Sequence, residues 1–509
     1  MDPTKFQTQQ PNYRSGVAPA DIDDSALAQQ IVRRRSRRKP TRGLWFGSGV
    51  ALLAGVALIG AGFATRSTVE VLDSSGPELV LSTPIASARR VPEFLVMPVA
   101  ARNLQGAVGP ALEGAPPGTC VEYRDSSSAV ASHNPAAPLV PASNMKILTA
   151  AIAVDVLGGS TRLKTTFATD GAPTDGATVK GNLYMIGGGD PLLTTDSYAA
   201  SNNHGTPPAT DLESVADQIV DTGIRHITGS VVGDESRYDA VRGADSWPER
   251  FFGQGQVGRL GALMVDDSWT PGRGPADNPA LHAATVMNDL LTERGVTIGG
   301  APKTGTAPPK ATTLVEIPSL TIAELAREAL AFSDNTTTEL LVKELGFSKG
   351  DGGSTAAGLK VMQDWVTSSG LPAEGVTFND GSGLSDADRL SCQFLSALIV
   401  AQGPTGVIAE GLAVPGQPGT LQDRFLAEPL RSRIRAKTGS LRGVTSLSGW
   451  LKTDAGKNLS FSILINTGDQ PTSNANLETQ RKVLTAALSY PQSPSIESLS
   501  PTPPVQHPN

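Results

Sequence analysis

The pattern of hydrophobic residues changes near residue 165 and changes back near residue 315, and this interruption constrains the fold more than any other feature. Within it lie short segments that alternate apolar and polar residues with frequent glycine and aspartate, such as GNLYMIGGGDPLL and ITGSVVGDESRYD. Alternation bounded by turn residues is typical of short strands. The sequence therefore predicts one domain made of residues 96–165 and 316–489, interrupted by β-rich inserted domains at residues 166–315.

The flanking parts combine helices with strands. Apolar residues at helical spacing, among them Met145, Leu148 and Ile152, predict a helix in SNMKILTAAIAVDVLGG that the two final glycines end. Residues 320–346 predict two helices interrupted at FSDN, and IRAKTGSLRGVTSLSGWLKTD and LSFSILINTG predict strands. The expected class is therefore α/β (α+β).

The N-terminal region carries a targeting pattern. Residues 1–42 contain nine Lys or Arg against four Asp, and residues 43–64 contain no charged residue. A run of this length behind a basic cluster predicts a transmembrane signal anchor, with a cytoplasmic basic tail and the catalytic part outside the cytoplasm of a bacterial cell. A cleaved signal peptide ending near residue 64 is the alternative. Residues 65–95 are interpreted as a linker, and the Pro/Ser-rich residues 490–509 as a disordered tail.

Composition narrows the ligand classes. The chain has a net charge of −7 and its first 42 residues carry +5, so the remainder carries −12, which argues against nucleic acid as a partner. No pair among the five histidines has the spacing of a zinc-binding helix. Cys120 and Cys392 could form one disulfide or be buried small hydrophobes, and the sequence does not decide between them.

One candidate nucleophile stands at the start of the helix that follows residue 142. Ser143 precedes Lys146 by three residues, which sets both side chains on one helix face. A serine needs a base within hydrogen-bond reach, and a lysine can be that base if burial favours its neutral form. Serine is also a common helix N-cap, and Ser36 and Lys39 repeat the spacing within the basic cluster. The spacing alone is therefore ambiguous.

Two further motifs of serine acyl-transfer enzymes follow Ser143 and Lys146 in the chain. Ser333-Asp334-Asn335 lies between two predicted helices, and Lys437-Thr438-Gly439, followed by Ser440, opens a predicted strand. Each has decoys, at residues 132–134 and 201–203 for Ser-x-Asn and at residues 303–305 for Lys-Thr-Gly. Order and element type favour a catalytic set of Ser143, Lys146, Ser333, Asn335 and Lys437, with Thr438, Gly439 and Ser440 as substrate-binding residues.

With these motifs, the chain resembles the D-alanyl-D-alanine carboxypeptidases and endopeptidases of the class C low-molecular-mass penicillin-binding proteins. The segments LVPASNMKILTAA, FSDNTTTELL and AKTGSLRGVTSLSGWL carry the likeness, as does the long interval between Ser143 and Ser333. The resemblance implies a serine β-lactamase/transpeptidase-like fold with an antiparallel five-stranded sheet flanked by helices. One departure is Asp388 in DGSGLSDADRLS, where the family usually has Asn; we interpret this loop as structural.

The resemblance also implies a mechanism. Ser143 would attack the carbonyl of the penultimate D-alanine, Lys146 would take its proton, and the backbone N–H groups of Ser143 and Ser440 would form the oxyanion hole. Ser333 and Lys437 are the candidates for passing the proton to the leaving D-alanine, and Asn335 would hold the acyl-chain amide. Lys437, Thr438 and Ser440 would receive the terminal carboxylate of the substrate.

The partners that the resemblance implies are peptidoglycan stem peptides, with β-lactam antibiotics as inhibitors, and it implies no cofactor or metal. The N-terminal pattern, outside the resemblance, predicts the membrane as a further partner. A β-lactamase is one rival reading, although the long insertion argues against it. A second rival is a membrane-anchored sensor or wall-binding protein that keeps the fold without turnover.

Overall fold

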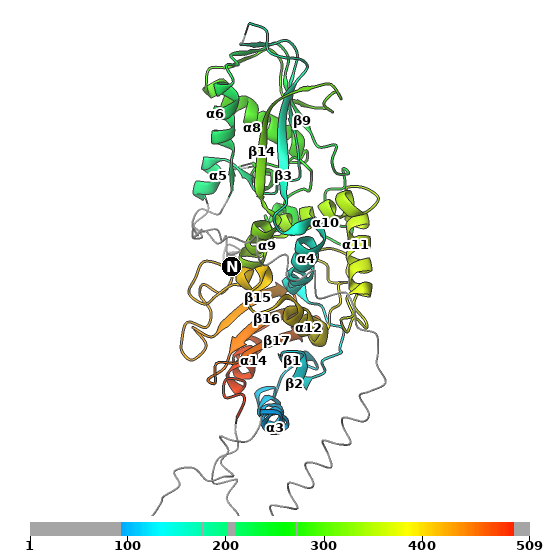
Figure 1. The fold of residues 1–509 in the computed structure, drawn as a ribbon, viewed down its shortest axis with the longest axis vertical. Coiled ribbons are helices and arrows are strands. Elements are labelled where there is room, and N and C mark those ends of the chain that lie inside the picture. The colour runs from blue at the N-terminus through cyan, green and yellow to red at the C-terminus, as the bar shows by residue number, and fades with distance from the viewer. Residues whose placement is uncertain (1–92, 176, 202–208, 271–272, 493–509) are drawn as a thin grey trace, which may run out of the picture. The chain divides into compact units, whose positions relative to one another are not determined.

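A five-stranded antiparallel sheet organises the part of the chain that holds the three motifs (Figure 1). The computed structural model describes residues 93–175, 177–201, 209–270 and 273–492, which belong to one compact unit. The strands follow the order β15 (Ile434–Leu441), β16 (Val444–Lys452), β17 (Asn458–Asn466), β1 (Gly118–Asp125) and β2 (Ser128–His133). Every neighbouring pair is antiparallel. The predicted sheet is thus confirmed, and β15 is one of its edges.

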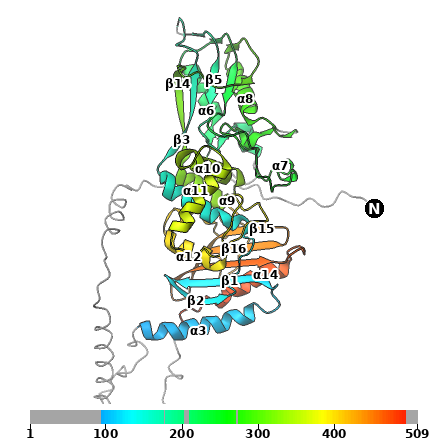
Figure 2. The ribbon, with the colours of Figure 1, turned by 90° about the vertical axis from the view of Figure 1, so that its right-hand side faces the viewer.

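Both faces of this sheet are buried, because successive side chains along each strand point to opposite faces and pack into two separate cores. In β17, Phe461 and Ile463 pack into one core and Leu464 into the other. The first core includes residues of α3 (Glu93–Ala111) and the C-terminal α14 (Asn474–Ala486), which lie on one side of the sheet in Figure 2. The second core belongs to a layer of helices on the opposite face.

The helical layer positions the motifs. Its members are α4 (Met145–Ala153), preceded by the 3-10 turn η2 (Ala142–Asn144) and continued by the π-helical turn η3 (Val154–Gly158), then α9 (Ile322–Phe332), α10 (Asn335–Lys349), α11 (Thr355–Ser368), α12 (Cys392–Gln402) and α13 (Val407–Gly411). Side-chain caps set where these helices begin: Thr321 and Glu324 form a capping box for α9, and Asp334 caps α10. The two helices predicted in residues 320–346 are therefore present, with the interruption at the predicted position.

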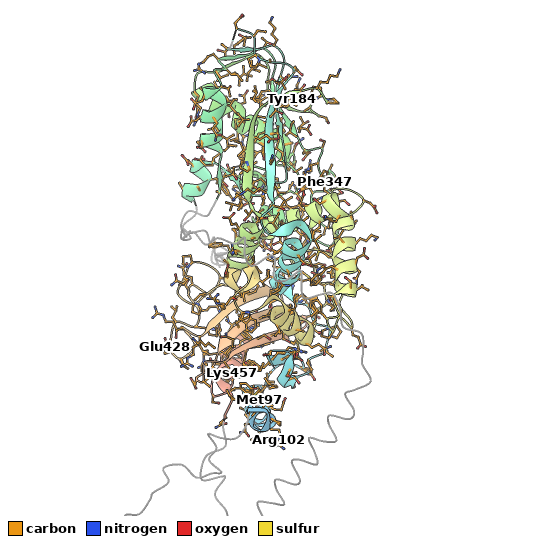
Figure 3. All side chains as sticks on the ribbon, viewed as in Figure 1. Met97, Arg102, Tyr184, Phe347, Glu428 and Lys457 are labelled. Carbon is orange, nitrogen blue, oxygen red and sulfur yellow. A yellow bond between two sulfur atoms is a disulfide. The ribbon has the colours of Figure 1, made fainter. Side chains whose placement is uncertain are left out.

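The residues between α4 and α9 form a second, mixed sheet with its own helices. Its strand order is β13 (Lys303–Thr304), β9 (Val231–Asp234), β5 (Leu183–Ile186), β3 (Arg162–Thr169) and β14 (Thr312–Thr321). The smaller sheets are β12 (Thr297–Ile298), β8 (His226–Ile227) and β4 (Thr178–Val179); β6 (Leu193–Thr194) and β7 (Thr210–Asp211); and β10 (Trp269–Thr270) and β11 (Gly274–Pro275). The helical elements are α5 (Asp196–Ser201), α6 (Leu212–Asp221), α7 (Arg250–Gly253), the 3-10 turn η4 (Asp266–Ser268) and α8 (Pro279–Glu293). Figure 3 labels Tyr184 on β5 of this sheet and Met97 and Arg102 on α3 beside the first sheet.

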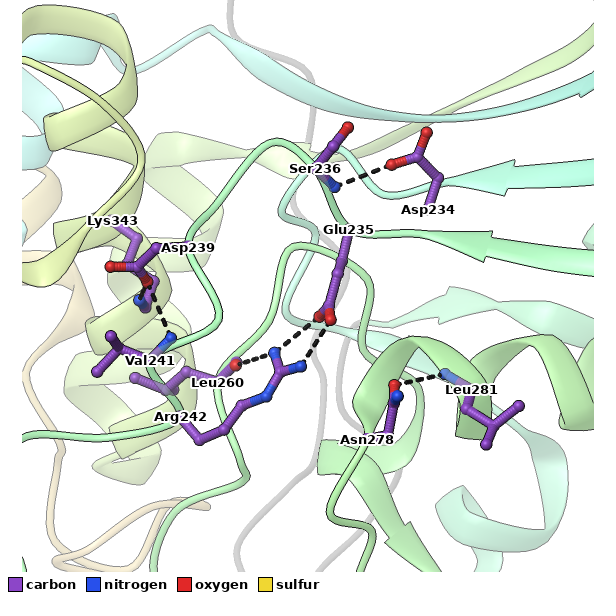
Figure 4. Close-up of polar contacts among 10 residues, drawn as sticks. All are labelled: Asp234, Glu235, Ser236, Asp239, Val241, Arg242, Leu260, Asn278, Leu281 and Lys343. Carbon is purple, nitrogen blue, oxygen red and sulfur yellow. Dashed lines mark hydrogen bonds and ion pairs between the residues drawn. The ribbon is translucent and has the colours of Figure 1, made fainter. Parts of the chain in front are cut away.

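A segment of the interrupting region, residues 235–265, packs on α10. Figure 4 shows Lys343 of α10 in contact with Asp239, and Arg242 held by Glu235 through bonds of 2.7 and 2.6 Å. The Lys343 side chain is fully buried and Asp239 is half-buried, and their ion pair links the segment to the helix. Apolar residues of the segment, Trp247 and Phe252 among them, join Leu340 of α10 in one cluster.

The two cysteines form a disulfide. Cys120 of β1 and Cys392 of α12 are joined by an S–S bond of 2.00 Å, and 272 residues separate them in the sequence. This resolves the alternative that the sequence left open, and it links a strand that precedes the second sheet in the chain to a helix that follows it.

The two ends of the described chain differ from what the sequence predicts. Within the described ranges, no helix has both the length and the apolar character needed to cross a membrane, so the predicted single-pass membrane location is corrected. The predicted anchor, residues 43–64, and the tail 1–42 lie outside the described residues. The predicted linker ended at residue 95, but α3 begins at Glu93; the two prolines inside α3 hide its helical pattern. Tyr490, the first residue of the predicted disordered tail, is buried in the core beside α14.

Candidate active site

Ser143 lies in the turn η2, which packs between the helical layer and the edge strand β15. The backbone before Ser143 is unusual, because Ala142 has a φ of 47°. Residues other than glycine rarely adopt this left-handed conformation. Pro141 O accepts a hydrogen bond of 2.7 Å from Ser446 Oγ, and Asn144 Nδ2 donates to the same Ser446 Oγ at 2.6 Å. These bonds tie the turn to β16 on both sides of the serine. Strained backbone held by its surroundings is typical of functional sites.

Lys146 points to Ser143 from the first turn of α4. Its Nζ lies 3.3 Å from Ser143 Oγ, 2.5 Å from Asn335 Oδ1 and 2.7 Å from the Ser382 carbonyl oxygen. The side chain is fully buried. Burial lowers the pKa of Lys146 to about 8, although the carboxyl groups of Asp380 and Glu339 act in the opposite direction. A lysine with such a pKa can act as a base near neutral pH.

The Ser-Asp-Asn motif forms the corner between α9 and α10. Ser333 ends α9 in a left-handed conformation with a φ of 63°, and Asn335 is the first residue of α10. Asn335 accepts from Lys146 and donates from Nδ2 to the Gln256 carbonyl at 2.7 Å. Within the described residues the Ser333 hydroxyl has no hydrogen bond to Lys146 or Lys437. The structure therefore brings the Asn335 side chain into a hydrogen bond with Lys146. In the described residues, the Ser333 hydroxyl forms no hydrogen bond with this lysine.

The Lys-Thr-Gly motif lies on β15 at the sheet edge. Lys437 is fully buried, and burial, together with the charge of Lys146, lowers its pKa well below the usual range. Its main-chain oxygen accepts a hydrogen bond of 3.3 Å from Asn144, the residue after the serine. A Cβ on Gly439 would lie 2.1 Å from Ser446 Oγ and 3.0 Å from Ser143 N, so only glycine fits this close approach. Thr438 is half-buried and Ser440 exposed on the same strand.

The decoy motif at residues 303–305 is found elsewhere. Lys303 and Thr304 form β13, an exposed edge strand of the second sheet. The decoy Ser132 lies in β2. Neither belongs to the arrangement around Ser143.

The loop of residues 379–388, interpreted from sequence as structural, lies directly against Lys146. Besides the Ser382 carbonyl on Lys146, Gly383 approaches so closely that a Cβ there would be 1.9 Å from Ala142 O. Glu339 of α10 accepts hydrogen bonds from Gly381 N at 3.0 Å and Ser382 N at 2.7 Å and so holds the loop in place. Sequence reasoning missed this part of the site because Ser382 acts through its backbone, which any residue could supply.

The interrupting region also reaches the site. The Gln256 carbonyl accepts from Asn335, Gly258 N donates to Thr336 Oγ1 at 2.9 Å, and Trp247 Nε1 donates to Asp380 Oδ2 at 2.8 Å. No signal in the sequence identifies these residues, because each is brought to the site only by the packing of residues 235–265 on α10.

A single group of carboxylates in the described ranges could share a metal ion. Asp196, Asp211 and Glu213 lie near one another at or near the surface. Asp211 already accepts from Ser214 N, and Glu213 from Asp196 N, which are bonds of ordinary helix starts. Nothing at this group indicates a metal.

The site combines a buried lysine beside a serine hydroxyl, an asparagine from a helix corner and a Lys-Thr-Gly edge strand, and such an arrangement could carry out serine acyl transfer. Comparison with known proteins agrees. Residues 102–273 and 273–488 match the D-Ala-D-Ala carboxypeptidase 3 (S13) family, and the chain belongs to this family. The predicted family is thus confirmed, and the chain is a peptidase.

Individual relatives are similar over most of their length. A D-alanyl-D-alanine carboxypeptidase of Actinomadura sp. (strain R39) is 26% identical over 444 residues, which cover 71% of this chain and 80% of the relative. The crystal structure of penicillin binding protein 4 (dacB) from Haemophilus influenzae has a TM-score of 0.64 and 20% identity, and the match covers 75% of this chain and 99% of that one. A structure of the same protein complexed with a novel β-lactam has a TM-score of 0.59 and 21% identity, with the same coverage. These two structures support the predicted fold.

Proposed function

We propose that this peptidase is a serine D-Ala-D-Ala carboxypeptidase, with DD-endopeptidase activity on cross-links, which works through an acyl-enzyme on Ser143. The observation that carries the proposal is Lys146 Nζ at 3.3 Å from Ser143 Oγ, in full burial and with a pKa lowered to about 8. The neutral amine takes the hydroxyl proton as the oxygen attacks the carbonyl of the penultimate D-alanine, and D-alanine leaves. Water then releases the acyl group.

Asn335, Ser333 and Lys437 complete the proposed catalytic set. Asn335 fixes the Lys146 amine through its Oδ1, and its place at the start of α10 suits it to hold the acyl-chain amide. Ser333, two residues away at the helix corner, and the buried Lys437 on the facing strand are the groups proposed to deliver a proton to the leaving amine. Burial and the charge of Lys146 lower the pKa of Lys437, which makes its ammonium form a stronger proton donor.

The edge strand β15 is the proposed substrate platform. An exposed strand edge offers backbone groups to an extended peptide. Thr438, Gly439 and Ser440 lie at that edge beside Ser143, and the substrate carboxylate would bind to Lys437, Thr438 and Ser440. The backbone N–H groups of Ser143 and Ser440 are the proposed oxyanion donors.

The proposed substrates are peptidoglycan stem peptides, and β-lactams are proposed to acylate the same serine. The similarity to carboxypeptidases of this family and to a protein solved with a β-lactam supports both partners. The division into residues 96–165 and 316–489 as the penicillin-binding domain, with residues 166–315 inserted, is likewise proposed. Strand β3 crosses the first of these boundaries and β14 the second, so continuous strands connect the inserted residues to the residues on either side.

Release of D-alanine from a peptide ending in D-Ala-D-Ala tests the function. The wild-type protein is expected to release D-alanine stoichiometrically with peptide consumed, and Ser143→Ala is expected to reduce the rate by at least about 10³-fold, because no other group can form the acyl-enzyme. Ser36→Ala, which alters the decoy spacing, is the matched control and is expected to retain the wild-type rate. Release by Ser143→Ala at the wild-type rate would contradict the assignment.

The same preparation distinguishes the two rivals. Penicillin labelling without release of D-alanine or cleavage of a cross-linked dimer would favour a sensor. Rapid turnover of penicillin, with the label lost within seconds, would favour a β-lactamase. A long-lived penicillin adduct together with D-alanine release is the result that the proposed function predicts.

A further inference from the structure

Three buried carboxyl groups lie around the loop that contacts Lys146. Asp380 and Asp388 belong to the loop itself, Glu339 comes from α10, and all three are fully buried. The charged groups that face them are Lys146 on α4 and one another, while the Arg389 guanidinium donates to the main-chain oxygens of Asp386 and Asp388. Three negative charges beside one lysine would be costly in a site without water, so protons must be retained within this group.

The hydrogen-bond donors distinguish the ionised carboxyl group from a protonated one. Asp380 accepts from Gly383 N, Ser385 N and Trp247 Nε1, each at 2.7 or 2.8 Å. Among the residues that the structure describes, Asp388 accepts only from Asn379 N, at 2.7 Å. Its Oδ2 is buried and receives no bond from a donor in the described residues, and the Asp380 carboxyl is the neighbouring group whose charge and hydrogen bonding act on Asp388. Two carboxyl groups can share a hydrogen bond only if one of them carries a proton.

We propose that Asp388 carries a proton on Oδ2 at neutral pH and donates it in a hydrogen bond to ionised Asp380, which makes Asp388 a positioning residue for Lys146. Burial and the neighbouring charge of Asp380 raise the pKa of Asp388 far above the usual range of an aspartate, in agreement with this geometry. The inference rests on the proposed function, in which Lys146 is the base.

The effect reaches Lys146 through the backbone of the loop. Asp380 binds the N–H groups of Gly383 and Ser385, and Ser382 between them presents its carbonyl to Lys146 Nζ at 2.7 Å. When Asp388 loses its proton, two adjacent carboxylates repel each other and the hydrogen bond that closes the loop is lost. The added negative charge also favours the protonated form of Lys146, which cannot act as a base.

Thermal stability as a function of pH tests the protonation without relying on catalysis. In the folded protein Asp388 keeps a proton that the unfolded chain releases, so folding stability falls as pH rises from about 4 toward the raised folded pKa. Asp388→Asn keeps a neutral donor and removes this dependence. Its melting temperature relative to wild type is therefore expected to rise by at least about 3 °C between about pH 5 and pH 8.

Asp386→Asn is the matched control, because Asp386 is an exposed carboxylate two residues away. Its difference from wild type is expected to stay constant over the same pH range. A difference between Asp388→Asn and wild type that stays constant with pH, or that becomes less favourable to the variant as pH rises, overturns the proposal.

The pH profile of acylation by penicillin tests the positioning role. In the wild-type protein and in Asp386→Asn, the acylation rate is expected to decrease at alkaline pH, because Asp388 ionises. In Asp388→Asn this decrease is expected to be absent. An identical alkaline fall in all three proteins would show that Asp388 does not act on Lys146. D-alanine release is not used, so failure here is distinguishable from failure of the proposed function.

If Asp388→Asn does not fold, infrared spectroscopy of the wild-type protein is the second measurement. A carbonyl band of a protonated carboxyl group is expected at about pH 8, where exposed carboxyl groups are ionised. Absence of that band would overturn the proposal.

Discussion

Lys146 illustrates how a residue acquires its chemistry from its surroundings. Its amine is enclosed by Ser143 Oγ, Asn335 Oδ1 and the Ser382 carbonyl, so it is hydrogen-bonded while removed from water. Desolvation disfavours the ammonium form, and the nearby carboxyl groups limit the shift, which leaves the pKa at about 8. The rate of acylation should therefore depend on the neutral fraction of this single side chain.

This gives a pH prediction with a definite sign. Because the folded pKa of Lys146 is about 8, the neutral fraction rises with pH below that value, reaches one half at the pKa and levels off above it. The acylation rate with penicillin is expected to increase about tenfold per pH unit below about pH 7 and to stop increasing near the pKa, measured by stopped-flow fluorescence. A rate that is constant across this range would contradict a lysine base with this pKa.

Lys146→Arg provides the companion measurement. Arginine keeps the charge and cannot lose its proton near neutral pH. Acylation by this variant should be lower by at least about 10²-fold at every pH, while Lys164→Arg, at an exposed lysine, should follow the wild-type profile.

At this scale the sequence could indicate residue types but not their surroundings. Ser143, Lys146, Asn335 and Lys437 could be selected because their side chains have recognisable chemistry at recognisable spacing. Ser382 could not be selected, because it acts through a backbone carbonyl that any residue would supply.

At the scale of elements, the close approach of β15 to the turn η2 is what assembles the site. Gly439 is the point of contact, since a Cβ there would overlap Ser446 Oγ at 2.1 Å and approach Ser143 N at 3.0 Å. The order and type of the elements could be predicted, because helix caps and strand alternation are local signals. The approach between two elements 296 residues apart in the chain could not, because it depends on how the sheet and helices pack.

The glycine pair in the two Lys-Thr-Gly motifs gives a matched test of this contact. Gly439→Ala is expected to lower the acylation rate at least about tenfold and to cost about 1–3 kcal/mol of unfolding free energy, because β15 must move away from Ser143. Gly305→Ala should change both far less, since a Cβ at Gly305 would meet only Val232 Cγ1, at 3.2 Å. Penicillin acylation and denaturant unfolding measure the two effects; equal effects at the two sites would contradict the proposed contact.

At the scale of the whole molecule, the site is held by links between distant parts of the chain. The Cys120–Cys392 disulfide joins β1 to α12, and closing so long a loop stabilises a fold by about 2–5 kcal/mol. Residues 235–265 add the Gln256 carbonyl to Asn335 and the Trp247 indole to Asp380. The interrupting region is therefore part of the support of the active site. The sequence predicts an insertion, but it does not predict which side of the insertion faces the site. That depends on contacts such as the ion pair between the buried Lys343 and Asp239, which have no local signature.

The position of the covalent adduct formed with penicillin identifies the nucleophile. Intact-mass measurement followed by peptide mapping is expected to find one penicilloyl group per chain, on the peptide that contains Ser143, and no adduct on Ser143→Ala. An adduct on any other residue, or one that persists in Ser143→Ala, would contradict the central claim that Ser143 is the nucleophile.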